Sequence, residues 1–168
     1  VEIQKTNRGP SVKISRSHSG LVKQLFKIEV PEIQDGIITI KNISRAPGQR
    51  TKIAVHSNNE NVSAVGTCVG HMGGRIQTIL SEINNEKIDI LEWHESPERF
   101  IANSLKPATV TKVIINDEEK KEATVVVPND KLSLAIGKSG LNVRLAVKLT
   151  RWKLDITSES DAEISSDQ

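Results

Sequence analysis

The stretch AIGKSGLNVRLA, residues 135–146, decides the fold of this chain. It places Gly137 and Gly140 around Lys138 and Ser139, between an apolar run and a helical pattern. Glycines at this spacing permit a tight turn and, because they lack Cβ atoms, let another backbone come close. The helix after the turn directs its unpaired N–H groups at the approaching group, and a phosphate suits that position. The stretch therefore predicts a phosphate-binding turn between two helices.

A second copy of this arrangement occurs upstream. In the stretch CVGHMGGRIQ, residues 68–77, Gly70 and Gly73 have the same spacing, 67 residues before the first pair. Ten glycines in a chain of this length produce about 0.6 such pairs by chance, so one pair alone means little. Both pairs, however, precede a helix that carries basic residues, at the same place in a longer repeated pattern. That repetition is the stronger signal.

The repeated pattern has the order helix, strand, strand, helix, glycine loop, helix, strand. The first copy predicts a helix from Ser19, strands at 37–44 and 52–57, a helix over 62–69 capped by the polar loop 58–61, a helix over 76–83 and a strand at 87–93. The second predicts a helix from Pro97, strands at 109–115 and 123–127, helices at 132–136 and 141–150, and a strand at 152–156. Hydrophobic periodicity supports each element. We expect an α+β fold with two tandem domains, residues 18–95 and 96–158.

The two ends of the chain differ from these domains. Residues 1–17 alternate around the turn signal 7–10 and predict a β-hairpin with a linker. A hairpin this short does not stabilise itself, so we expect it to pack on the first domain or to belong to a larger β-domain. Residues 159–168 contain Ser, Glu, Asp and Gln without a core pattern, which predicts a disordered tail. The chain starts at Val1 rather than Met, so we expect a part of a longer protein.

Composition limits the classes of function. Of 168 residues, 36% are hydrophobic and 26% charged, which indicates folded domains of modest core size. The net charge is only +2, so nucleic-acid binding would depend on local clusters of cations. Four aromatic side chains are too few for recognition by rows of stacking platforms. Base recognition would then use hydrogen bonds and aliphatic contacts.

Other chemistry has little support. The single cysteine, Cys68, excludes an internal disulfide and argues against a cysteine zinc cluster, which favours a reducing cytoplasm. The four histidines lack metal-ligand spacing, and no Ser–His–Asp set is detectable in the sequence. We therefore expect no metal, no cofactor and no catalysis. No signal peptide or run of membrane-spanning length is present, so no membrane partner is expected. A nucleotide-binding P-loop is rejected, because Leu132 stands where that motif needs glycine.

The candidate RNA-contacting residues lie in and beside the two glycine loops. In the second copy they are Gly137, Lys138, Ser139, Gly140, Asn142, Arg144, Lys148 and Arg151. In the first copy they are Gly70, His71, Met72, Gly73, Gly74 and Arg75. Arg45, Arg50 and Lys52, in the two predicted strands and the turn over 37–57, are possible neighbours of this loop. Arg144, Lys148 and Arg151 form a basic stripe along the predicted helix. A separate leucine stripe, Leu141, Leu145 and Leu149, is suited to pack on a sheet. The alternatives are a merely solvated basic face and merely structural tight turns.

Several stretches resemble a known family. IGKSGLNVRLA, residues 136–146, closely resembles the second KH domain of the NusA family of bacterial transcription factors. RAPGQRTKIAVHS (45–57) and GTCVG (66–70) resemble its first KH domain, and NRGPSVKISR (7–16) resembles the end of its OB-type β-barrel. The resemblance implies paired KH domains of the helix-first order, α-β-β-α-α-β (type II), packed into one rigid surface that binds single-stranded RNA.

The same resemblance implies a role. The family modulates RNA polymerase pausing, termination and antitermination on the nascent transcript, in the bacterial cytoplasm. Polymerase would be contacted mainly through regions absent from this chain, and we expect a monomer. Two other hypotheses stay open: a protein-interaction scaffold with little RNA affinity, and a KH accessory module of a ribosome-assembly protein.

Two residues depart from the family pattern. Met72 stands where the family commonly carries Arg, and Leu141 where it carries Gln. The second loop keeps a lysine and the basic stripe, whereas His71 and Met72 lie between the glycines of the first. We therefore expect the second loop to supply most of the phosphate affinity and the first to act as a positioning contact.

Overall fold

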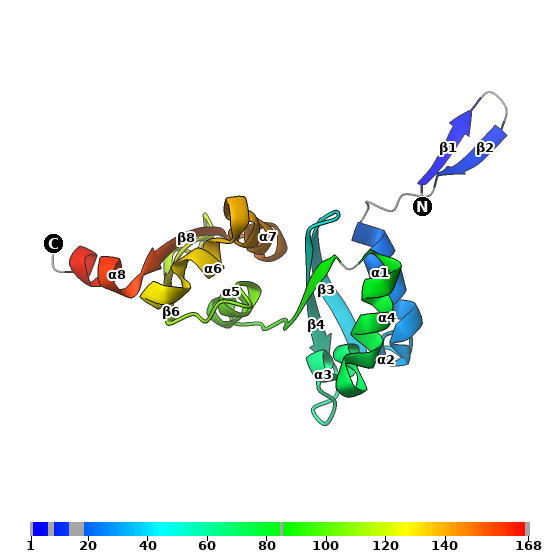
Figure 1. Ribbon diagram of the computed structural model, residues 1–168, viewed down its shortest axis with the longest axis horizontal. Coiled ribbons are helices and arrows are strands. Elements are labelled where there is room, and N and C mark those ends of the chain that lie inside the picture. Colours follow the sequence, from blue (N-terminus) through cyan, green and yellow to red (C-terminus); the bar gives the residue numbers. More distant parts are fainter. Residues whose placement is uncertain (1, 7–8, 14–18, 85, 167–168) are drawn as a thin grey trace.

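The computed structural model describes residues 2–6, 9–13, 19–84 and 86–166. Strands β1 (Glu2–Thr6) and β2 (Gly9–Lys13) pair antiparallel, which confirms the predicted hairpin. Part of its predicted turn and most of its linker lie outside the described residues. In Figure 1 the hairpin stands away from the rest of the molecule. Its origin in an OB-type barrel stays a prediction.

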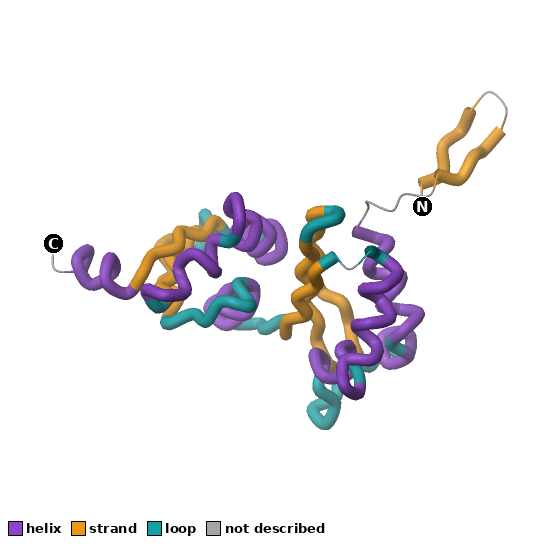
Figure 2. Tube along the Cα trace, in the orientation of Figure 1, coloured by secondary structure: helices purple, strands orange, loops and turns teal. Residues whose placement is uncertain are grey.

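The first unit is a three-stranded sheet with helices on one face (Figures 1 and 2). Its elements are α1 (Ser19–Glu29), α2 (Pro31–Gln34), β3 (Ile38–Ala46), β4 (Arg50–Ser57), α3 (Ala64–Val69), α4 (Gly74–Glu82) and β5 (Lys87–Glu92). The order in the sheet is β3-β4-β5, with β3 antiparallel and β5 parallel to the central strand. Val22, Phe26, Ile53, Cys68 and Ile79 are buried together in its core. Burial raises the pKa of the Cys68 thiol to about 11, in keeping with a core residue.

The second unit repeats this architecture. Its elements are α5 (Pro97–Ser104), β6 (Lys112–Asp117), β7 (Glu122–Val127), α6 (Leu132–Ile136), α7 (Leu141–Thr150) and β8 (Lys153–Ser158). The sheet order β6-β7-β8 has the same antiparallel and parallel pairs. Ile101, Leu105, Val125, Ala146 and Trp152 are buried in its core. The predicted repeat and its helix-first order are both present.

Three local features differ from the sequence prediction. Helix α2 follows α1 directly, because Pro31 is well suited to a first helical turn. Helix α3 is capped by Ser63, whose Oγ accepts from the Gly66 N–H, rather than by the polar loop 58–61. Strand β6 begins at Lys112, three residues after the predicted start.

The predicted disordered tail is wrong for residues 159–166, which form helix α8 (Glu159–Ser166). Its first turn is held from outside: Thr111 donates to Glu159, and Asn129 bonds Ser160 through both its amide nitrogen and its oxygen. The Ser158 hydroxyl also accepts from the Asp161 N–H. An apolar pattern is therefore not needed here, because the helix start is fixed by polar contacts to distant residues.

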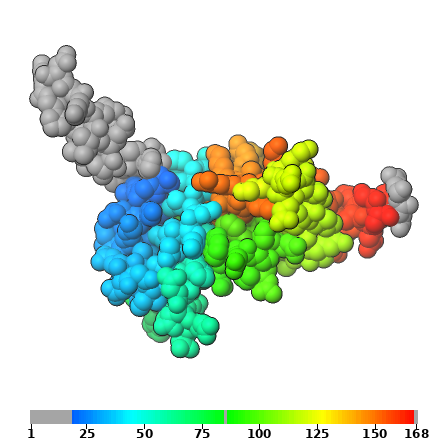
Figure 3. Space-filling view, turned by 180° about the vertical axis from the view of Figure 1, so that it is seen from behind, coloured from blue at the N-terminus to red at the C-terminus, as the bar shows by residue number. Residues whose placement is uncertain are grey.

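The two units pack against each other. Ala54 of β4 and Leu91 of β5 lie on the sheet face opposite the first unit's helices, and they contact Phe100 of α5 and Leu149 of α7. Trp93 packs against this cluster. In Figure 3, residues of the first sheet lie directly against the second unit. Leu149 of α7 therefore faces the sheet of the first unit.

No described helix is long and apolar enough to cross a membrane.

Candidate nucleic-acid interface

The two glycine loops share one backbone conformation. The first glycines, Gly70 and Gly137, have φ of 81° and 80°. At the third position Met72 and Ser139 have φ of 53° and 56°, and the last glycines have 74° and 72°. Positive φ at a non-glycine residue is uncommon, so its occurrence at the same position of both loops is informative. The loops are structural equivalents, as the sequence predicted.

The first glycine of each loop is required by close helix approach. A Cβ on Gly137 would lie 2.7 Å from the backbone nitrogen of Asn142, and one on Gly70 would lie 2.7 Å from Cγ of Arg75. The last glycine is different, because a Cβ on Gly140 would meet nothing within 4 Å. Close packing therefore explains why the first position of each loop is a glycine.

The middle of each loop is exposed to solvent. Lys138 and Ser139 project at the second loop, and His71 and Met72 at the first, where Met72 is 92% exposed. The residue before each following helix is a glycine, which has no side chain to cap the helix. The N–H groups of Gly74 and Leu141, the first residues of α4 and α7, donate to the His71 and Lys138 carbonyls. The N–H groups that follow them in each first turn can receive the oxygens of a ligand.

Helix α7 carries two cations of the predicted basic stripe, Arg144 and Lys148, whereas Arg151 follows its last residue with φ of 63°. Arg144, Lys148 and Arg151 lie outside the core, whereas Leu145 and Leu149 are buried. The basic stripe is therefore a surface feature. Arg144 and Lys148 lie on the helix whose N-terminus adjoins Lys138.

A cavity of about 460 Å³ separates the second loop from the first unit. Its lining from the second unit includes Gly137, Lys138 and Ser139, and its lining from the first unit is Gln49, Arg50 and Lys87. Sequence analysis missed Gln49 and Lys87. No local pattern marks them, because they reach the second loop only through the packing of the two units.

The first loop has its own cavity of about 520 Å³, lined by residues of the first unit that include Glu32, His71 and Arg75. The Arg75 guanidinium is already engaged: its Nη1 donates to Glu32 Oε2 at 2.9 Å and to the Thr67 carbonyl at 2.9 Å. A backbone N–H, and then the Arg75 hydrogen bond, lower the pKa of Glu32, so the pair is ionised at neutral pH. Much of the positive charge of Arg75 is therefore neutralised locally.

The three basic residues predicted beside the first loop lie elsewhere. Arg50 lines the cavity at the second loop and donates to Asp89 Oδ2 at 2.8 Å. Arg45 is buried against Glu86, with its Nε 3.1 Å from Oε2. Lys52 is also buried. These possible neighbours of the first loop therefore have partners elsewhere, because the strand that carries Arg50 and Lys52 turns them toward the second unit.

Lys52 leaves no surface for direct RNA contact, because its side chain is 0% exposed. Its Nζ donates to Asp89 Oδ2 at 3.0 Å and to the Lys106 carbonyl at 2.6 Å. Burial lowers the pKa of Lys52, and the nearby Asp89 carboxylate partly opposes that effect.

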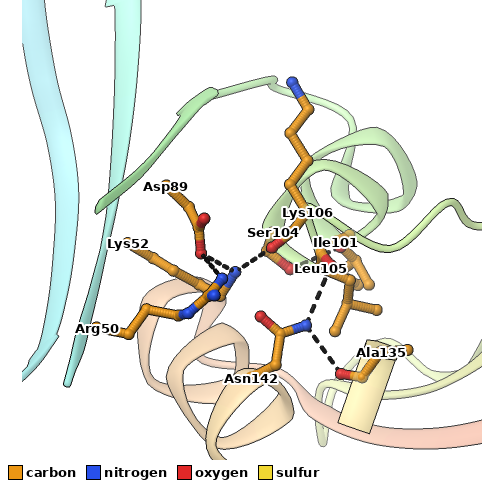
Figure 4. A network of polar contacts seen from close by, with 9 residues as sticks. All are labelled: Arg50, Lys52, Asp89, Ile101, Ser104, Leu105, Lys106, Ala135 and Asn142. Atoms are coloured by element: carbon orange, nitrogen blue, oxygen red, sulfur yellow. Dashed lines mark hydrogen bonds and ion pairs between the residues drawn. The ribbon is translucent and has the colours of Figure 1, made fainter. Parts of the chain in front are cut away.

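Asn142 is likewise buried, at 4% exposure, although it was a candidate for RNA contact. Its Nδ2 donates to the carbonyls of Leu105 at 3.1 Å and Ala135 at 2.9 Å (Figure 4). These bonds tie α7 to the end of α5 and to α6. The side chain therefore supports the loop from behind.

Among the residues that the structure describes, no group of three or more His, Cys, Asp or Glu side chains is placed to hold a metal ion.

Two family models match the chain. The model of the NusA-like first KH domain matches residues 16–93, and that of the NusA-like second KH domain matches residues 97–164. Together they span the two units and both glycine loops.

Similar proteins agree with the two family models. The chain is 53% identical over 162 residues to a transcription termination/antitermination protein NusA of Halalkalibacterium halodurans, covering 96% of this chain and 42% of that protein. It is 52% identical to the protein of the same name from Bacillus subtilis, covering 96% of this chain and 43% of that protein. It is 49% identical to the protein of the same name from Thermus thermophilus, covering 98% of this chain and 41% of that protein.

Among solved structures, the crystal structure of APE1850 shares the fold, with a TM-score of 0.58 at 20% identity over 83% of this chain and 97% of that chain. The chain spans about two fifths of the length of these three NusA relatives. The two matched models and the high identity together place the chain in the NusA family, of which it carries the tandem pair of KH domains.

Proposed function

We propose that this chain binds single-stranded RNA through its two KH domains, as the RNA-contacting part of a factor that modulates pausing, termination and antitermination. The observation that carries the proposal is the second loop. There, exposed Lys138 and Ser139 adjoin the N-terminus of α7, which also carries the exposed Arg144 and Lys148. A phosphodiester is the ligand that suits such a site.

The second loop also draws on the first domain. Lys87 and Arg50, which is paired with Asp89, line the same cavity as Lys138, so basic side chains from both domains surround one space. Its volume of about 460 Å³ lies within the range of pockets that hold small ligands. In this proposal an RNA strand held at the second loop contacts both domains at once. Base edges would then be recognised by hydrogen bonds and aliphatic contacts.

The first loop has a weaker case for phosphate binding. Its backbone matches that of the second loop, but Met72 brings no charge and Arg75 is paired with Glu32. We propose that it positions the strand while the second loop supplies most of the phosphate affinity. RNA polymerase would be contacted mainly through regions outside this chain. The chain itself would act as a monomer and without catalysis.

The test exchanges the middle residues of one loop. The double variant Lys138→Asp, Ser139→Asp replaces a cation by two anions at the proposed phosphate position. Asp tolerates the positive φ of position 139, so the fold should persist. We expect the affinity for a single-stranded RNA to fall by about tenfold or more, because a charge-assisted hydrogen bond is lost and repulsion is added. Fluorescence anisotropy with a labelled leader transcript measures it.

The chain supplies its own matched control. The double variant His71→Asp, Met72→Asp introduces two anions at the equivalent positions of the first loop, which have the same backbone conformation. A smaller loss of affinity is expected there. Unchanged affinity in a folded second-loop variant would sink the clamping role and would favour the protein-interaction scaffold. Equal losses at the two loops would refute the proposed asymmetry.

A further inference from the structure

Lys52 is an unusual residue for the centre of a sheet. It lies on the central strand β4 and is 0% exposed, whereas lysine is almost never fully buried unless its charge is paired. Its side chain lies on the face that the second domain covers. One of its two hydrogen bonds, to the Lys106 carbonyl, crosses from the first domain to the second.

The apolar contact around Lys52 does not by itself fix one arrangement. Ala54, Leu91, Phe100 and Leu149 make a small cluster, and apolar packing is not directional. A buried ammonium is costly unless its donors are satisfied, so an interface that contains Lys52 is favourable only where Asp89 and the Lys106 carbonyl are in place. Two further hydrogen bonds cross between the domains, from Asn42 Nδ2 to the Leu149 carbonyl and from Asn103 Nδ2 to the Glu92 carbonyl. Lys52 differs from these amides because it is a buried charge, so a docking geometry that left it unpaired would cost the most.

Figure 4 shows that this contact continues to Asn142, in the first turn of α7. Lys52 binds the carbonyl of Lys106, and the preceding carbonyl, that of Leu105, accepts from Asn142. Asn142 in turn packs closely on Gly137: a Cβ added to Gly137 would lie only 2.7 Å from the backbone nitrogen of Asn142. Each step is a direct contact. A shift of the Lys106 carbonyl would therefore move the support of the loop.

We propose that Lys52 is a positioning residue, which holds the second glycine loop in register with the first domain without touching RNA itself. The inference rests on the proposed function, since register matters only if one strand contacts both domains. A strand bound at two linked sites gains affinity from their fixed spacing, and loses that gain when the geometry no longer matches. A short strand reaches only one of the two glycine loops, so it gains nothing from their fixed spacing.

The test compares two lengths of RNA on the same variant. Lys52→Met keeps the length of the side chain and removes its charge, while Asp89 keeps Arg50 as a partner. The probes are labelled single-stranded RNAs of about four nucleotides, the length that one KH loop clamps, and about twelve nucleotides. We expect the longer RNA to bind about tenfold more weakly and the shorter one to keep its affinity within about twofold.

The matched control is Lys153→Met, the same change at an exposed lysine at the start of β8. It is expected to leave both affinities within about twofold. Residual dipolar couplings measured by NMR report the relative orientation of the domains, and they should change in Lys52→Met and not in the control. Should Lys52→Met fail to fold, Lys52→Arg keeps the charge but needs more room at the Lys106 carbonyl, and the same split between the two RNAs is expected.

The outcomes separate the two proposals. Equal losses for short and long RNA, or no loss for either, would overturn the positioning role. Unchanged dipolar couplings in a folded Lys52→Met would overturn it even without any RNA measurement. If the unsubstituted chain binds neither RNA, the proposed function fails, while the couplings still decide whether Lys52 sets the orientation of the domains.

Discussion

At the scale of single residues, burial separates cations that look alike in the sequence. Lys138, Arg144 and Lys148 lie at the surface of the second loop and its helix, as predicted. Arg45 and Lys52 are buried in ion pairs, although their sequence context resembles that of the surface residues. Charge alone therefore identified the candidates, and only the positions of Glu86 and Asp89 showed which of them are occupied by structural partners.

Glu86 gives a prediction at this scale. Its carboxylate is 1% exposed and accepts from Arg45, from the Gly48 N–H at 2.7 Å and from Thr51 Oγ1 at 2.6 Å. Burial by itself would raise its pKa, but these bonds outweigh burial and hold the pKa of Glu86 below its ordinary value of 4.5. Breaking a buried pair typically costs about 3 kcal/mol, so Glu86→Gln should lower the free energy of unfolding by that order at neutral pH.

The pH dependence of that loss is set by the direction of the shift. Because the folded pKa is lowered, the contribution of Glu86 is complete above pH 4.5 and is lost as the pH falls through the folded value. The difference between the unsubstituted chain and Glu86→Gln should therefore shrink in acid. Urea denaturation over a pH series measures it, with the exposed Glu60→Gln as a control expected within about 0.5 kcal/mol. A difference that is constant with pH would contradict the assignment.

At the scale of elements, the glycine loops were well predicted because their requirements are local. Spacing of glycines, an apolar run before and a periodic helix after are all visible in a few residues. Helix α7 was predicted with both its boundaries, Leu141–Thr150. Helix α8 was missed for the opposite reason, because its first turn is held by Thr111 and Asn129, which are distant in sequence.

The glycines of the second loop differ in a way that can be measured. Gly137 has φ 80° and ψ 169°, a region essentially open to glycine alone, and a Cβ there would clash with Asn142. Gly140 has φ 72° and ψ 15°, the left-handed helical region, with open space around it. We expect Gly140→Ala to cost about 1 kcal/mol of unfolding free energy and Gly137→Ala more than about 3 kcal/mol.

Thermal and urea denaturation of the two variants provide the measurement, and each serves as the control of the other. The change in side chain is the same, so a difference between them reports the close approach of the helices together with the more restrictive backbone conformation of Gly137. Similar costs for Gly137→Ala and Gly140→Ala would show that the contact with Asn142 relaxes easily.

At the scale of the whole molecule, the charge is nearly balanced, with a net value of +2. Lys138, Lys87 and Arg50 line one cavity, and Arg144 and Lys148 are exposed on the helix that begins beside Lys138. A local cluster of this kind contacts few phosphates. Binding should therefore depend on salt, but moderately.

The slope of affinity against salt concentration tests this point. If Lys138 and the three cations of the basic stripe each neutralise one phosphate, the log–log slope should be about −3 for a single strand. Titrations by fluorescence anisotropy between about 50 and 200 mM salt measure it, and Lys148→Gln should reduce the magnitude of the slope by about one. A slope twice as steep would indicate a widespread polybasic surface and contradict the local cluster.

The sequence by itself determined the repeat, the order of the elements and the two loops. These depend on local rules: the period of apolar residues, the spacing of glycines and the residues that begin helices. The packing of the domains was decided only by the tertiary structure. A sheet has two faces, and the pattern of β4 does not show what covers the second one, so Lys52 looked like a surface cation and Lys87 was overlooked. Whether a charged side chain binds a ligand or holds two domains together depends on contacts made across the whole chain.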